Sequence, residues 1–172
     1  MKIGNDIRWL ASGPRCGFGE ILLPAIQPGS SIMPGKVNPV LAESLTQVCA
    51  QVIGNDVTVT IAGQSGNFEL NVMMPVMAHN VLESVELLSS SSKIFATDCI
   101  AGIQPNRKRC ESLIEESLAM CTSLAPVIGY DKAAAIAKKA YAEGKTVRDI
   151  VYEDKILDKK EADKILNPQK MI

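Results

Sequence analysis

The stretch NPVLAESLTQVCAQVIGNDVTVTIAG, residues 38–63, decides the fold class of this chain. Asn38 and Pro39 have the form of a helix N-cap followed by proline at the first helical position. Apolar and small residues then occupy nearly every face, which predicts a helix that is buried all round. The β-branched run at 57–61 would favour a strand, but Gly54 is the only turn signal in the stretch. We therefore predict a single helix ~36 Å long.

A second long apolar segment follows a turn at GQSGNF, residues 63–68, and predicts a helix over 69–100. Pro75 is expected either to kink this helix or to lie in its first turns. Each helix is too apolar to be covered by one neighbour, so we expect a homo-oligomeric bundle completed by other copies. The predicted fold class is all-α: long buried helices of a multi-subunit helical bundle plus a small C-terminal helical domain.

The pattern of apolar and charged residues changes after residue 102. Residues 1–102 are expected to form part of the bundle domain, with a short helix at 2–11 and a long irregular loop before the first long helix. Residues 103–172 contain amphipathic patterns among many charges, which predict a separate small helical domain. Two capping-box pairs mark helix starts in this part of the chain: Thr146 with Asp149, and Asp158 with Glu161.

Composition excludes several classes of function. The 172 residues are 47% hydrophobic and only 4% aromatic, with a net charge of −1, so nothing favours binding to nucleic acid or to a membrane. A single histidine and no clustered ligands make a metal site improbable, and we expect neither metal nor organic cofactor. An odd number of cysteines without CxxC spacing predicts reduced thiols. The five are Cys16, Cys49, Cys99, Cys110 and Cys121. All except Cys16 lie in apolar helical patterns and are expected to be buried.

Most of the polar side chains that could carry chemistry in the first half of the chain lie in QPGSSIMPGKVNP, residues 27–39. We call residues 27–38 of this stretch the serine loop. A phosphate-binding Walker loop is excluded, because five residues rather than four separate its glycines and Val37 follows the lysine. A plain surface loop with serines bonded to their own backbone is the simpler alternative. However, Lys36 and Asn38 come just before a helix N-terminus, which itself attracts anions. We favour a carboxylate-binding loop.

The segment GSSIMPGKVNP resembles the S-S-x-M-P-x-K-x-N-P signature of the fumarase/aspartase superfamily. Four further stretches are similar to class II fumarase in particular: NDIRWLASGPRCGFGE, GNFELNVMMPV, GIQPNR and IGYDKAA. The chain departs from many fumarases at Ala125 and Val127, where Asn and His are usual. The resemblance covers the whole chain but only the C-terminal portion of the family's polypeptide, and the chain itself begins inside a helical pattern. We expect it to be cut from something longer.

This resemblance implies reversible hydration of fumarate to malate in the citric acid cycle, by a homotetramer in the cytoplasm, or in the mitochondrial matrix if the source is a eukaryote. It implies that Ser30 abstracts the proton, while Ser31, Lys36 and Asn38 bind the dicarboxylate. Glu43 matches the carboxylate that orients the family's catalytic histidine, which lies in an upstream segment absent from this chain. Its simpler interpretation is a first-turn acid favoured by the helix dipole.

The single histidine of this chain, His79, does not match that catalytic motif, and we expect it to be a packed residue between helices. Two alternatives to fumarase remain. An aspartase-like ammonia-lyase would use the same loop with an amine leaving group, and a fragment without activity would act only in assembly. We expect the chain by itself to be inactive, because the missing upstream part would carry the histidine side of the site and the remaining bundle helices. The resemblance also implies that each active site draws residues from three subunits.

Overall fold

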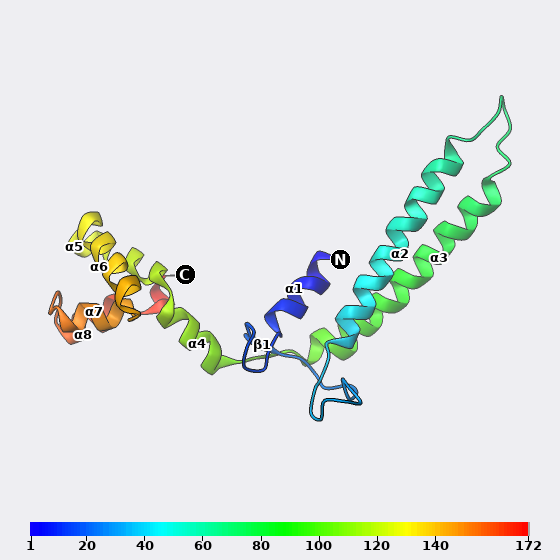
Figure 1. Ribbon diagram of the computed structural model, residues 1–172. Coiled ribbons are helices and arrows are strands. Elements are labelled where there is room, and N and C mark those ends of the chain that lie inside the picture. Colours follow the sequence, from blue (N-terminus) through cyan, green and yellow to red (C-terminus); the bar gives the residue numbers. More distant parts are fainter. Residues whose placement is uncertain (172) are drawn as a thin grey trace. The chain divides into compact units, whose positions relative to one another are not determined.

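The computed structural model describes residues 1–171 and divides them into two compact units (Figure 1). The first unit is Met1–Asn106, and the second begins at Arg107. The described part is mainly helical, and its only strands are two segments of two residues each. The predicted all-α fold class is confirmed.

The boundary between the units lies slightly beyond the position expected, which was after residue 102. The segment β2 (Gln104–Pro105) pairs antiparallel with β1 (Ile21–Leu22), which precedes the serine loop. Hydrogen bonds therefore tie the residues immediately after 102 to the first unit, although no regular helix continues there.

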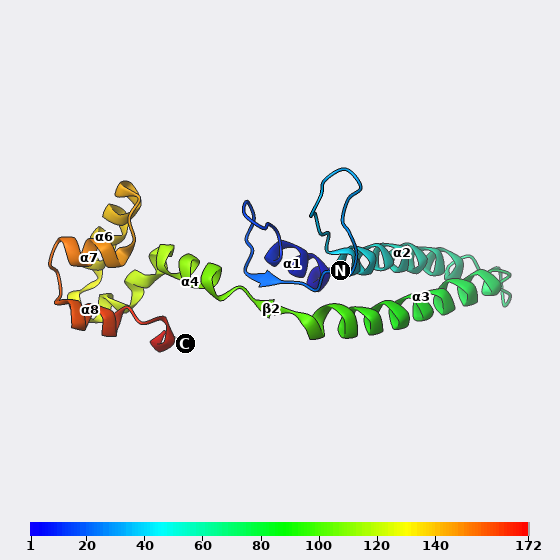
Figure 2. The ribbon, with the colours of Figure 1, turned by 90° about the horizontal axis from the view of Figure 1, so that it is seen from below.

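A long helical hairpin forms most of the first unit. Its two helices, α2 (Val40–Gly63) and α3 (Met74–Ile94), lie side by side in both views of the ribbon (Figures 1 and 2). The helix α2 continues through residues 57–61, so the prediction of a helix rather than a strand is confirmed. The predicted helix at 2–11 is also present, as α1 (Lys2–Leu10), and packs against α2.

The second long helix begins at Met74, later than predicted, because a structured turn occupies the preceding residues. Asn67 and Leu70 form an isolated bridge. The Asn71 side chain accepts the Met73 N–H at 2.8 Å and donates to Ala62 O at 3.0 Å, so it holds the turn against α2.

Pro75 lies in the first turn of α3, which is one of the two positions expected for it. After Ile94 the helix changes its winding. One π-helical turn, η1 (Phe95–Cys99), is followed by a short 3₁₀ turn, η2 (Ile100–Gly102). The predicted single helix to residue 100 is therefore three consecutive elements.

A hydrogen bond between two buried asparagines joins the long helices, because the Asn55 amide donates to Asn80 O at 3.3 Å. Asn55 of α2 is 3% exposed and Asn80 of α3 is 9% exposed. The Asn55 amide donates to Glu83 Oε2 at 2.8 Å and lies 3.0 Å from Ser84 Oγ, while Asn80 donates to Val76 O at 2.7 Å. These bonds satisfy the buried amides, because a buried polar group without a partner is costly.

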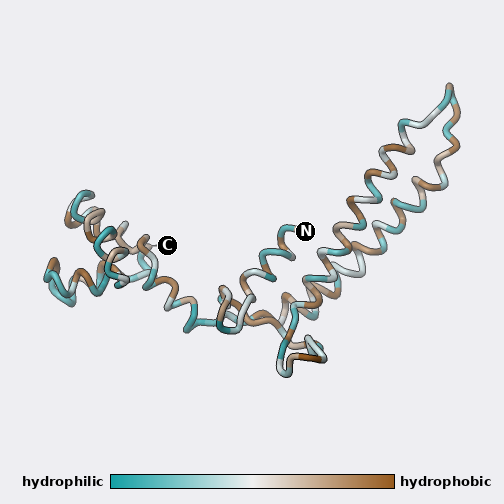
Figure 3. Tube along the Cα trace, in the orientation of Figure 1, coloured by the Kyte–Doolittle hydropathy of each residue, from teal (hydrophilic) through white to brown (hydrophobic). Residues whose placement is uncertain are grey.

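Much of the apolar surface of the hairpin is exposed within one chain. Figure 3 shows apolar positions spread along both helices. Only Ala42, Asn55 and Ala62 of α2 are buried. The exposed large side chains include Ile53, Val57, Ile61, Val81, Leu82 and Val85. The described segment by itself therefore leaves much of the apolar surface of the long helices uncovered, and their predicted burial all round is not seen within it.

The second unit is a small helical cluster. It consists of α4 (Arg107–Glu116), η3 (Leu118–Ser123), α5 (Ala125–Ile128), α6 (Tyr130–Glu143), α7 (Val147–Glu153), α8 (Lys159–Ile165) and η4 (Pro168–Lys170). Its core is formed by fully buried side chains: Leu124, Val147, Ile150, Val151 and Leu166. The capping box at Thr146 is confirmed, and Asp158 accepts the Glu161 N–H at 3.0 Å.

Two cysteines, Cys49 and Cys110, depart from the expected burial. Cys99 and Cys121 are buried, and burial raises the pKa of both thiols. Cys49 and Cys110 are only half-buried, and Cys16 is exposed. His79 is also exposed within this chain rather than packed. Among the described helices, none combines the length and the apolar character needed to cross a bilayer.

Candidate functional site

The serine loop is closed at its base by two hydrogen bonds. The Gly29 N–H donates to Lys36 O at 2.7 Å, and the Asn38 side-chain amide donates to Gly29 O at 2.9 Å. A Cβ at Gly29 would lie 2.6 Å from Lys36 O and 2.7 Å from Asn38 N. Only glycine allows the two arms of the loop to approach this closely. The closure brings Lys36 and Asn38 to the arm of the loop opposite Ser30.

Ser30 has the best-defined polar environment in the loop. Its Oγ accepts the backbone N–H groups of Ile32 and Met33, both at 3.1 Å, and the residue is half-buried. Two N–H donors that point at one oxygen stabilise negative charge on it. A hydroxyl held in this way is better suited to lose its proton than a free serine.

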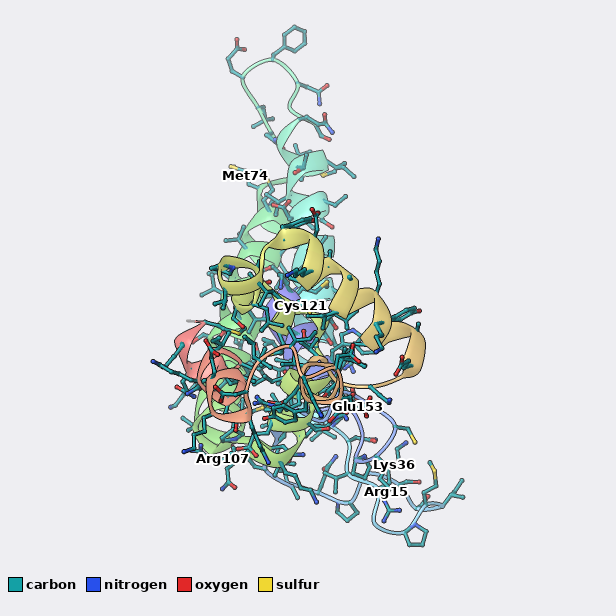
Figure 4. The ribbon with its side chains drawn as sticks, turned by 90° about the vertical axis from the view of Figure 1, so that its left-hand side faces the viewer. Arg15, Lys36, Met74, Arg107, Cys121 and Glu153 are labelled. Atoms are coloured by element: carbon teal, nitrogen blue, oxygen red, sulfur yellow. The ribbon has the colours of Figure 1, made fainter. Side chains whose placement is uncertain are left out.

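Lys36 and Ser31 are exposed. Figure 4 shows the labelled Lys36 on the serine loop. The lysine offers a positive charge, and no hydrogen bond or ion pair of its ammonium group is found within residues 1–171. A carboxylate that binds here would not have to displace an existing partner.

The predicted N-cap role of Asn38 is wrong. The N-cap of α2 is Pro39, and no described side chain caps the helix. The Asn38 amide is instead bonded to Gly29 O across the loop. An amide nitrogen carries two N–H groups, so this bond leaves one donor for a ligand. The uncapped N-terminus of α2 adds a partial positive charge beside it.

Glu43 lies one turn into α2 and is half-buried. Its carbonyl oxygen accepts the Thr46 hydroxyl at 2.8 Å. Within the described residues, no hydrogen bond joins its carboxylate to the serine loop. The structure thus brings Ser30, Lys36 and Asn38 together in one closed loop, and it places Glu43 on the adjoining helix.

Sequence reasoning missed the closing function of Gly29. The only local signal was a glycine next to the serine pair, whereas its partners lie at the far end of the loop.

No group of three His, Cys, Asp or Glu side chains in residues 1–171 is arranged to hold a metal ion. A concavity of about 760 Å³ at Tyr152, Lys155 and Lys159 contains none of the predicted site residues.

Known proteins match the chain along its length. Two families match parts of it: Lyase over residues 1–54, and Fumarase C C-terminus over residues 120–172. Fumarate hydratase class II from Thermosynechococcus vestitus is 55% identical over all 172 residues, and the chain spans 37% of that relative. Fumarate hydratase 1, mitochondrial, from Arabidopsis thaliana is also 55% identical over the whole chain, which spans 35% of it.

A solved structure confirms the fold. The fumarate lyase:delta crystallin from Brucella melitensis, bound to cobalt, has a TM-score of 0.93 at 52% identity. The alignment covers 99% of this chain and 37% of the solved chain. The helical hairpin, the serine loop at its base and these matches make the chain similar to a segment of the proteins of the fumarase/aspartase superfamily. The expected resemblance to the C-terminal part of class II fumarases is confirmed, and the chain spans about a third of the length of the relatives it matches.

Proposed function

We propose that the protein to which this segment belongs interconverts fumarate and malate, and that the serine loop supplies the base and part of the dicarboxylate site. The observation that carries the proposal is the environment of Ser30, whose Oγ accepts two backbone N–H groups at 3.1 Å. The names of the 55% identical relatives point to the same reaction. The segment is about a third of their length, so the complete activity is a proposal.

The chemistry explains why such a loop is needed. Removal of the proton at C3 of malate leaves a carbanion whose charge spreads onto the adjacent carboxylate. Groups that hold this developing dianion lower the barrier more than groups that bind both states equally. Ser30 would take the proton, and the N–H groups of Ile32 and Met33 would stabilise its oxyanion.

The remaining loop residues would bind the substrate. Lys36 offers an ammonium group, Ser31 an exposed hydroxyl, and Asn38 its second amide N–H. Glu43 would orient a histidine supplied by the upstream part of the family's polypeptide. No cofactor is required in this scheme, because protein donors supply the electrostatic stabilisation.

We further propose that the protein is a homotetramer that acts in the citric acid cycle. The exposed apolar faces of α2 and α3 support assembly, because one chain leaves them open to water. The cytoplasm is the proposed location, or the mitochondrial matrix for a eukaryotic source, since the relatives include bacterial and mitochondrial proteins.

The experiment uses a fusion of this chain to the upstream part of a 55% identical relative. Ser30→Ala should lower kcat for malate dehydration by ~10²–10³-fold while a dicarboxylate inhibitor still binds. Lys36→Ala should weaken both binding and turnover, because both states carry the carboxylate charge. Ser44→Ala, at an exposed serine of α2, is the matched control and should change neither. Near-normal turnover in Ser30→Ala would exclude this serine as the base.

The same fusion separates the alternatives. Dehydration of malate without release of ammonia from aspartate supports a fumarase, whereas the opposite result would identify an ammonia-lyase. The 172-residue chain alone should be inactive and self-associated. A monomer that hydrates fumarate unaided would overturn the proposal of a shared active site.

A further inference from the structure

Both ends of the serine loop rest on the same segment of chain, residues 95–106, which follows α3. At the C-terminal end of the loop, the first turn of α2 is anchored by Ala42, which is 0% exposed. Ala42 packs in one cluster with Phe95 and Cys99, the two residues that delimit the π-helical turn η1. The start of α2 therefore cannot move without disturbing this cluster.

At the N-terminal end of the loop, hydrogen bonds fix the approaching chain. The strands β1 and β2 pair with Ile21 opposite Pro105. Asn106 then bonds two consecutive carbonyls: its backbone N–H donates to Glu20 O, and its side-chain amide donates to Gly19 O, both at 2.9 Å. Two bonds from one residue fix both the register and the direction of the chain that enters the loop.

A close steric contact completes this support. A Cβ at Gly102 would lie 2.5 Å from Pro24 Cγ, well inside ordinary van der Waals distance. Gly102 does not have a positive φ, so its small size rather than its backbone freedom is required. Pro24 is three residues before Gln27, where the serine loop begins.

We propose that Gly102 and Asn106 are positioning residues for the serine loop, which act through residues 19–24. Neither touches the groups assigned to substrate, yet together they determine where the chain enters the loop relative to the start of α2. Because one segment holds both ends, the separation of the ends is set, and with it the placement of Ser30. This inference rests on the proposed function for its kinetic readout.

The decisive variant is Gly102→Ala in the fused enzyme. The added methyl group requires Pro24 to move by about 1 Å, and a misplacement of that size lowers turnover by ~10²-fold. Pro24→Ala removes the clashing Cγ, so the double variant should recover most of the loss. Gly63→Ala is the matched control, since a Cβ added there would meet nothing within 4 Å beyond the adjacent residues and the backbone of its own helix.

A second variant covers the case in which Gly102→Ala fails to fold. Asn106→Asp keeps the size of the side chain and the backbone N–H but removes the donor to Gly19 O. It should lower kcat by ~10-fold, which corresponds to the loss of one hydrogen bond. The melting temperature of each variant identifies losses that are due to unfolding.

Hydrogen exchange gives a readout independent of activity. The amides of Ile32 and Met33 donate to Ser30 Oγ, so they should exchange faster in Gly102→Ala and at the original rate in the double variant. If the unmutated fusion does not dehydrate malate, the proposed function fails, while exchange still supports or overturns positioning. Exchange in Gly102→Ala equal to that in Gly63→Ala would overturn the proposal.

Discussion

Arg148 joins three helices of the second unit, and its removal tests how that unit is held together. It lies in α7 and forms a bidentate pair with Glu115 of α4, with Nε 2.9 Å from Oε2 and Nη2 2.8 Å from Oε1. Its Nη1 donates to Asp163 Oδ1 of α8 at 2.8 Å, and Nη2 also donates to Leu166 O at 2.7 Å. Hydrogen bonding to Glu115 is the main cause that raises the pKa of Arg148.

The magnitude of the expected loss follows from these contacts. The Arg148 side chain is 22% exposed and Glu115 is 38% exposed, so solvent screens the ion pair itself. The carbonyl of Leu166, a residue with 0% exposure, would lose the Arg148 donor. Together, the screened bidentate pair and the carbonyl predict that Arg148→Ala destabilises the second unit by ~2–3 kcal/mol.

Hydrogen exchange of the α7 amides measures this loss in the intact chain. Val147, Ile150 and Val151 are fully buried there, so their amides exchange only when the unit opens. A loss of ~2–3 kcal/mol should accelerate their exchange by ~30- to 160-fold. Arg148→Lys should lie between, because a lysine keeps the charge but not the planar fork.

Lys145→Ala is the matched control. Lys145 also forms two ion pairs, with Glu143 at 2.9 Å and Glu153 at 2.6 Å, but they are at the surface and hold no buried carbonyl. Its removal should change exchange only a few-fold. Equal acceleration in Arg148→Ala and Lys145→Ala would refute the argument that burial and bidentate geometry matter here.

Three further predictions concern the loop, acid stability and thiol reactivity. Gly29→Ala should lower turnover of the fused enzyme by ~10²-fold, because the added Cβ lies within 3 Å of backbone atoms across the loop; unchanged kinetics would contradict the closure described. Hydrogen bonding, first from the Thr146 side chain, lowers the pKa of Asp149. The stabilisation by its carboxylate is therefore present above the unfolded pKa of 3.8 and is lost as pH falls through the lower folded pKa. Urea titrations from pH 6 to 2 should show that Asp149→Asn loses less of its free energy of unfolding in acid than the unmutated chain. Alkylation at pH 8 followed by mass spectrometry should label exposed Cys16 before Cys99 and Cys121. Burial both shields the thiols of Cys99 and Cys121 and raises their pKa. Equal alkylation rates for the three cysteines would contradict this.

Local patterns in the sequence were sufficient for several features of this protein. The capping box at Thr146 depends on neighbours within one helical turn, so the local sequence specifies it. The helix through residues 57–61 was predictable despite its β-branched residues, because the long apolar stretch has no turn signal except Gly54. The serine loop was recognisable for the same reason, because its chemistry is concentrated in a dozen consecutive residues. The roles of Ser30, Ser31, Lys36, Asn38 and Glu43 stay predictions.

Tertiary structure decided the features that depend on residues far apart in the chain. Asn38 has the residue type of an N-cap, yet its amide bonds Gly29 nine residues away. Likewise, the late start of α3 reflects the bond from Asn71 to Ala62 O. Asn106 meets Gly19 across 87 residues. Such contacts depend on the path of the whole chain, which no short window of sequence contains, and they determine where the loop's chemistry is placed.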